Sequence, residues 1–123
     1  MIIKERKIKG TFEIVFEPFE DERGFFMRTY DKKIFEEHGI PCEWAQENES
    51  FSKNRGTIRG LHFQHPPHAE GKFIRVVSGE AFIVWADIRK GSETFGKWDA
   101  ITLSSSKKNA VYISRGFANG LCT

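Results

Sequence analysis

The segment RGTIRGLHFQHPPHAEGKF, residues 55–73, carries side chains that could do two different kinds of chemistry. His62, His65 and His68 recur every three residues, and imidazole is a common metal ligand. Arg59 and Lys72 are cations that could hold an anion such as a phosphate. The segment therefore suggests either a metal centre or an anion-binding site.

The histidine spacing argues against the metal centre. A mononuclear site in a small barrel usually combines His-x-His with a carboxylate and a distant histidine, whereas no histidine follows His68 here. On a strand, His62 and Gln64 would share one face, His65 would lie on the other, and His68 would lie beyond two prolines. We therefore expect no bound metal, and we expect His65 and His68 to be exposed loop residues.

His62 has a different neighbourhood. Arg59, His62 and Gln64 lie in an apolar strand context with Leu61 and Phe63 between them, and Lys72 opens the next strand. Polar side chains that face the inside of a barrel need partners, so this series favours a ligand cavity. A hydrogen-bonded core histidine with cations on the surface explains the same residues, and the residues alone leave both interpretations open.

The surrounding sequence predicts mostly strands. Residues 11–18 alternate with Phe12, Ile14 and Phe16 on one face, which is typical of a half-buried strand. Further strands are predicted within 72–88, as two runs joined at 78–80, and at 97–105 and 110–114. Short strands at even spacing with turn residues between them favour a mainly β, antiparallel jelly-roll barrel.

One short helix is predicted within residues 30–40. Asp31 can cap its N-terminus, Ile34 and Phe35 supply an apolar stripe, and Gly39 with Pro41 ends it.

Length and composition limit the possible partners. A chain of 123 residues is one domain with a single core, and we place the domain at 1–123. With 19 basic and 17 acidic residues the chain has no strong net electrostatic field, so we expect neither a nucleic acid nor a membrane as its partner. Cys42 and Cys122 have no metal or disulfide spacing, and residues 1–18 are too charged for a signal peptide. We therefore expect a soluble cytoplasmic protein with free thiols.

Five motifs, in order, carry a resemblance that covers nearly the whole chain. They are DERGFF at 21–26, QENESFS at 46–52, GTIRGLHFQ at 56–64, ADIRKGSETFGKW at 86–98 and ISRGFANG at 113–120. Together they resemble the dTDP-4-dehydrorhamnose 3,5-epimerase family, a branch of the cupins. The resemblance implies a jelly roll without metal or other cofactor. It also implies a homodimer in which the N-terminal strand pairs with the partner's sheet.

The implied reaction is inversion of carbons beside the ketone of a nucleotide-linked 4-keto-6-deoxy sugar. Such a reaction needs a base, a group that stabilises an enolate oxygen and an acid on the opposite face. By resemblance, His62 is the base and Lys72 stabilises the oxygen.

The resemblance also implies a set of substrate contacts. Guanidinium groups suit a diphosphate, amides suit neutral contacts, and an aromatic ring suits the pocket wall. The implied contacts are Arg23, Phe26, Gln46, Asn48, Arg59, Gln64 and Asn119, with Gln46 and Asn48 on a strand.

The sequence also departs from the family pattern. Asn119 stands where the family has a histidine, Ser114 replaces a proline, Arg28 a glutamate and Ile83 an acidic residue. These changes suggest another sugar or nucleotide, or relaxed selection. In the family a C-terminal region follows this point and supplies a tyrosine acid and an aspartate that orients the histidine, and neither is among the 123 residues.

Two hypotheses therefore stand. The first is an epimerase, or the core of one, acting in deoxysugar, rhamnose and surface polysaccharide biosynthesis. The alternative is a cupin that binds a nucleotide sugar without turning it over, or a truncated inactive form. Both hypotheses use the cations Arg23, Arg59 and Lys72 to bind the nucleotide sugar. Only the epimerase needs acid-base activity, so that activity distinguishes the two hypotheses.

Overall fold

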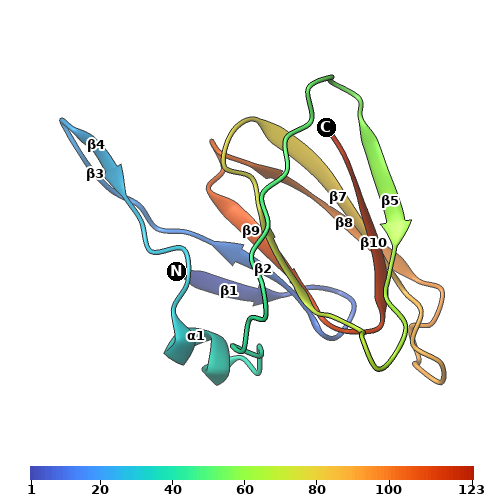
Figure 1. Cartoon of the computed structure of the whole chain (residues 1–123). Coiled ribbons are helices and arrows are strands. Elements are labelled where there is room, and N and C mark those ends of the chain that lie inside the picture. The colour runs from blue at the N-terminus through green and yellow to red at the C-terminus, as the bar shows by residue number, and fades with distance from the viewer.

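The computed structural model describes all 123 residues as two antiparallel sheets packed face to face (Figure 1). The first sheet has the order β1 (Ile2–Glu5), β2 (Thr11–Val15), β9 (Asn109–Ile113), β6 (Lys72–Arg75). The second has the order β5 (Ile58–His62), β10 (Phe117–Cys122), β7 (Glu80–Asp87), β8 (Trp98–Ser104). A separate hairpin of β3 (Phe19–Asp21) and β4 (Gly24–Phe26) projects away from this body, and one short helix, α1 (Lys32–Glu37), lies beside the first sheet.

Strand β9 separates two cores because both of its faces are buried. Val111 and Ile113 point between the two sheets and join a cluster of nine buried residues, which includes Trp85 and Leu103. Ala110 and Tyr112 point to the outside of the first sheet and pack in a second cluster. The other members of that cluster are Ile14, Phe16, Phe35 and Ile40. Because α1 contributes Phe35 to this second cluster, the first sheet is covered on both faces.

Helix α1 follows the sequence prediction. The Asp31 side chain accepts a hydrogen bond from the Ile34 amide at 3.2 Å, and this bond lowers the pKa of the Asp31 carboxyl. Gly39 follows the helix with φ of +71°, the left-handed conformation that glycine adopts most readily. The predicted cap and stop are confirmed.

Most strand predictions are confirmed, and three elements were missed. The strands at 11–18, 72–88, 97–105 and 110–114 correspond to β2, β6 with β7, β8 and β9. Strand β1, the β3–β4 hairpin and β10 were not predicted. Strand β10 lies in the middle of the second sheet, although its glycine and asparagine residues are typical of a turn.

The turn between β7 and β8 is organised by Asp87. This buried carboxylate accepts hydrogen bonds from the Arg89 side chain at 2.8 and 3.0 Å, from Ser92 Oγ at 2.7 Å and from Thr94 Oγ1 at 2.5 Å. The Arg89 guanidinium also lies 4.6 Å from the centre of the Phe117 ring. These bonds lower the pKa of the Asp87 carboxyl well below its usual range. Motif 86–98 therefore holds a turn and does not line the site described below.

No helix of the chain has the length and apolar character that crossing a membrane requires.

Candidate functional site

A bulge in β5 turns two of its polar residues toward the same side. Asn119 of β10 lies opposite His62, and Leu121 lies opposite Arg59. A separation of three residues on β5 therefore matches a separation of two residues on β10, which defines the bulge. Residues directly opposite one another in an antiparallel pair point to the same face. Arg59 and His62 therefore share a face, which the regular alternation of a strand would not allow.

The register across the second sheet identifies that face as the inner one. Asn119 also lies opposite Trp85, and Leu121 lies opposite Ile83; both partners belong to the core between the sheets. His62, Asn119 and Trp85 consequently form a row across β5, β10 and β7 on the inner surface. Asn119 is buried, whereas His62 at the sheet edge is accessible to solvent.

Gly60 brings the His62 ring close to the sheet. A Cβ atom at Gly60 would lie 2.8 Å from His62 Nδ1 and 2.6 Å from the Asn119 carbonyl oxygen. Gly60 also has φ of +91°, which side chains of L-residues rarely permit. Glycine is therefore needed at the bulge for the imidazole to lie against Asn119.

Lys72 faces the same interior from the opposite sheet. It lies opposite Ile113 of β9, whose side chain is in the core between the sheets. The Lys72 ammonium contacts the Glu70 carboxylate at 3.2 Å, and both side chains are partly exposed. Sequence analysis missed Glu70, although its place two residues before Lys72 would put both on one side of an extended chain.

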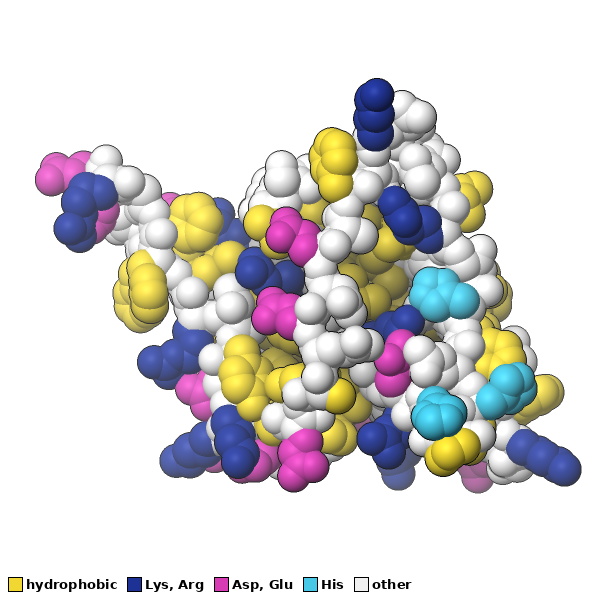
Figure 2. Space-filling view, viewed as in Figure 1, with side chains coloured by type: hydrophobic (Ala, Val, Ile, Leu, Met, Phe, Trp, Pro, Cys, Tyr) yellow, Lys and Arg dark blue, Asp and Glu magenta, His cyan; other side chains and the backbone are white.

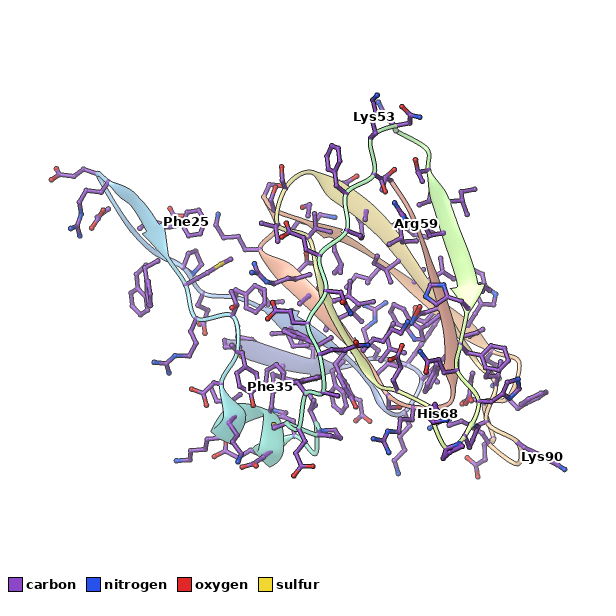
Figure 3. All side chains as sticks on the ribbon, viewed as in Figure 1. Phe25, Phe35, Lys53, Arg59, His68 and Lys90 are labelled. Carbon is purple, nitrogen blue, oxygen red and sulfur yellow. The ribbon has the colours of Figure 1, made fainter.

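Arg59 connects the site to the segment that precedes β5. This connecting segment, residues 41–57, contains no helix or strand. The Arg59 guanidinium donates to the Phe51 carbonyl oxygen at 3.2 Å and, more weakly, to Ser52 Oγ at 3.4 Å. In Figure 3 the Arg59 side chain lies between β5 and this segment. Figure 2 shows a hollow there, with hydrophobic side chains at its floor and Lys or Arg side chains inside it.

Two predicted contacts lie outside this hollow. Arg23 is at the tip of the β3–β4 hairpin, where it donates to Asp21 at 2.6 Å, and Phe26 is 71% exposed on β4. The ion pair raises the pKa of Arg23 and lowers that of Asp21. Because the hairpin projects away from the sandwich, one copy of the chain does not bring Arg23 or Phe26 to His62 (Figure 1).

The strand predictions for the amide residues were wrong. Gln46 and Asn48 are exposed in the connecting segment, because no neighbouring strand supplies its backbone with a hydrogen-bond ladder. Strand β5 ends at His62, so Gln64 is an exposed residue beyond it and does not share a strand face with His62. Roles for these three amides stay predictions.

Comparison with known proteins identifies the family. The family model described as dTDP-4-dehydrorhamnose 3,5-epimerase matches residues 5–123. The chain belongs to this family. It is 50% identical over 112 residues to the dTDP-4-dehydrorhamnose 3,5-epimerase of Shigella flexneri, a match that covers 89% of this chain and 61% of the relative. It is 45% identical over 109 residues to that of Methanothermobacter thermautotrophicus, covering 87% and 58%.

Solved structures of the dTDP-4-dehydrorhamnose 3,5-epimerase family show the same fold. The enzyme from Bacillus anthracis, with TDP and PPi bound, is 38% identical with a TM-score of 0.95 over 99% of this chain and 70% of that one. The enzyme from Legionella pneumophila, in complex with dTDP-4-keto-L-rhamnose, is 39% identical with a TM-score of 0.92, covering 99% and 64%. The predicted jelly roll is confirmed. The chain spans about three fifths of the length of the curated relatives it matches.

Within this epimerase-family fold, the histidines do not form a metal cluster. His65 lies beyond β5 with its ring 4.9 Å from the Phe63 ring, and His68 is exposed in the β5–β6 loop. No group of three His, Cys, Asp or Glu side chains is placed to hold a metal ion.

We predict that the purified chain, without a histidine tag, binds no metal. Elemental analysis should find zinc, iron, nickel and manganese well below one ion per chain, because the three histidines do not converge. A stoichiometric ion that is lost in His62→Ala would contradict this prediction and the proposed role of His62.

Trp85 was not recognised from the sequence as part of the site. It is fully buried opposite Asn119, and its indole Nε1 has no hydrogen-bond acceptor in the protein. The position of Trp85 in a strongly apolar strand predicts only core packing. Its register with β10 places it beside Asn119 and His62 on the inner surface.

Proposed function

We propose that this chain forms the core of an epimerase acting on a nucleotide-linked 4-keto-6-deoxy sugar such as dTDP-4-dehydro-6-deoxyglucose. The observation that carries the proposal is the inner face: His62 and Arg59 from one sheet and Lys72 from the other line the same space. By analogy with its relatives, the protein would serve rhamnose and surface polysaccharide biosynthesis in the cytoplasm.

The residue types match the proton transfers that epimerisation needs. His62 would take the proton from C3 or C5. The C–H electron pair would form a C=C bond to C4, and the π electrons of the carbonyl would move onto the C4 oxygen. Imidazole is suited to this step because it titrates near neutral pH. The Lys72 ammonium would stabilise the enolate oxygen, after which a proton delivered to the opposite face would invert the carbon.

Arg59 is proposed to hold the diphosphate. In the free chain its guanidinium donates to a backbone carbonyl and a hydroxyl, both neutral acceptors. A diphosphate oxygen forms stronger, charge-assisted bonds with guanidinium and could replace these partners. Asn119 offers an uncharged amide next to His62, at a position where the resemblance implies a histidine.

We expect Arg59→Ala to weaken binding of a nucleoside diphosphate by about 1.5 to 3 kcal/mol, or roughly ten- to a hundredfold, because it removes charge-assisted bonds. Titration calorimetry with TDP at low salt measures the change. Arg75→Ala is the matched control, because Arg75 is an exposed arginine on β6. Equal dissociation constants for Arg59→Ala and the unsubstituted chain would show that Arg59 only anchors the connecting segment.

A homodimer would complete the site. Arg23 and Phe26 lie far from the hollow of their own chain but sit on a projecting, exposed hairpin. A second copy could place this hairpin at the mouth of the hollow. Strand β1 pairs with β2 of its own chain, and its other edge has no partner within the chain, so strand pairing between copies stays a prediction.

The positions of the two tyrosines bear on the alternative function, a binding module without turnover. Tyr30 packs against Phe35 and Trp44, and Tyr112 packs against Trp44, in the aromatic cluster outside the first sheet. Burial raises the pKa of Tyr112. Neither hydroxyl therefore faces the inner polar row. The test that separates the two functions is hydrogen exchange at the bound sugar, described in the Discussion.

A further inference from the structure

The side chains of His62 and Lys72 face one another's sheets across the inner space. His62 stands on the second sheet opposite Asn119, and Lys72 stands on the first sheet opposite the core residue Ile113. His62 ends β5 and Lys72 begins β6, so the two residues lie at the two ends of the β5–β6 loop, residues 63–71. A sugar ring held between the sheets would therefore present one face to the imidazole and the other face to the ammonium.

The Lys72 ammonium has the chemistry of a proton donor. It carries three N–H groups, and its contact with Glu70 leaves two of them for a ligand. Ammonium and phenol groups are acids of similar strength in water, so a lysine can donate where a tyrosine could. Tyr30 and Tyr112 pack in the aromatic cluster outside the first sheet, whereas Lys72 lies on the inner face of that sheet.

Glu70 restricts where the Lys72 ammonium can lie. The Glu70 carboxylate is 3.2 Å from Lys72 Nζ. Between these residues the backbone packs closely on a buried ring, because a Cβ atom at Gly71 would lie 2.7 Å from the Tyr112 hydroxyl oxygen. An ionised carboxylate accepts hydrogen bonds and donates none, so Glu70 is a positioning residue and Lys72 is the donor.

We propose that Lys72, positioned by Glu70, returns the proton that inverts the carbon, an inference that rests on the proposed function. An N–H bond of the ammonium breaks as a C–H bond forms at C3 or C5. The C=C electron pair of the enolate makes the new C–H bond, and an electron pair of the oxygen forms the carbonyl again. His62 is left as imidazolium and Lys72 as amine, and exchange of one proton with water at each group restores both.

Lys72 has two tasks in this scheme, which makes the second one slow. The ammonium first binds the enolate oxygen and must then turn to the adjacent carbon. Meanwhile His62 can return a hydrogen from solvent to the original face, which gives exchange without inversion. The ratio of epimer formed to hydrogen exchanged therefore reports how well a donor acts from the side of Lys72.

This ratio is measured by proton NMR and mass spectrometry of dTDP-4-keto-6-deoxyglucose incubated with the chain in D₂O. Lys72→Arg keeps the positive charge, but its guanidinium does not give up a proton at neutral pH. We expect Lys72→Arg to lower the ratio at least about tenfold, because a positioned acid is lost. Lys97→Arg, at an exposed lysine before β8, is the matched control and should leave the ratio unchanged.

Variants of Glu70 test the positioning role. Glu70→Ala should lower the ratio several-fold, because the ammonium loses the carboxylate that holds it. Glu70→Gln should restore part of the ratio, because its amide oxygen can still accept a hydrogen bond from Lys72, and such a rescue distinguishes positioning from a general loss of structure. Glu93→Ala, at an exposed glutamate between β7 and β8, is the matched control.

Chemical modification separates the charge of Lys72 from its protons. Lys72→Cys alkylated with 2-bromoethylamine regains an ammonium with N–H groups, whereas alkylation with (2-bromoethyl)trimethylammonium restores the charge alone. The first product should show a ratio at least about tenfold above that of the second. The unsubstituted chain given both treatments controls for alkylation of Cys42 and Cys122, the two free thiols.

Three results would overturn this inference alone. Equal losses of epimer and of exchange in Lys72→Arg would leave Lys72 only as the group that stabilises the oxygen. An unchanged ratio in Glu70→Ala would remove the positioning role of Glu70. Exchange without any detectable epimer in the unsubstituted chain would show that no donor acts from the side of Lys72. If the unsubstituted chain binds TDP but exchanges no hydrogen, the proposed function fails and this inference fails with it.

Discussion

His62→Ala is expected to reduce hydrogen exchange at C3 or C5 of a 4-keto sugar nucleotide by about 10²- to 10⁴-fold, the usual contribution of a positioned base. The chain itself should exchange slowly and accumulate little epimer. In the proposed mechanism His62 and Lys72 suffice for proton removal, but neither Tyr30 nor Tyr112 faces the hollow to return a proton from the other side. The measurement is proton NMR and mass spectrometry of dTDP-4-keto-6-deoxyglucose in D₂O, with the GDP-linked analogue in parallel.

The control for this experiment is His65→Ala, a histidine of the same segment that lies beyond the end of β5. It should exchange hydrogen as fast as the unsubstituted chain. If the chain binds nucleotide but exchanges no faster than His62→Ala, the binding module is correct and the epimerase is not. If it converts the sugar rapidly and completely, another residue acts as the acid, and our account of the tyrosines is wrong.

Asp87→Ala should be the most destabilising single change outside the site. It removes a buried acceptor that receives bonds from Arg89, Ser92 and Thr94, and it leaves the guanidinium without its partner. We expect a loss of about 3 kcal/mol in the free energy of unfolding. This value is at the lower end of the stability loss expected when a buried ion pair is broken, since Arg89 is 33% exposed. Urea unfolding followed by tryptophan fluorescence measures the loss.

The pH dependence of stability gives a second measure of Asp87. Its pKa is lower in the folded than in the unfolded chain, so the stability it contributes is complete above the unfolded pKa of about 3.9. That contribution is lost as the pH falls below this value toward the folded pKa. Asp87→Ala should therefore flatten the loss of stability below about pH 4 relative to the unsubstituted chain.

Asp21→Ala is the matched control for both measurements. Asp21 accepts bonds from the backbone amide and guanidinium of Arg23, two residues later, as Asp87 does from Arg89. The Asp21 pair is exposed at a hairpin tip, so its removal should leave the free energy of unfolding almost unchanged. Similar losses in the free energy of unfolding for Asp87→Ala and Asp21→Ala would show that burial in the turn does not strengthen the Asp87–Arg89 pair.

Local sequence determined the elements whose signals lie within a few residues. The helix at α1 follows from a capping side chain, a buried Phe35 and a terminal glycine, all local effects. Alternating residues predicted β2, because side chains of a strand alternate between two environments, and a run rich in β-forming residues predicted β7. The five motifs indicated the family, and the even spacing of short strands indicated the jelly roll.

Only the tertiary structure decided which residues meet. The bulge opposite Asn119 and Leu121 puts Arg59 and His62 on one face, and strict alternation along the sequence predicts the opposite. Strand β10 forms despite Gly120 because β5 and β7 supply backbone partners on both sides. The connecting segment lacks such partners and forms no strand. Lys72 joins the site by the packing of two sheets, and the hairpin carries Arg23 away from it. Register and sheet packing depend on contacts between distant residues, which local propensity does not encode.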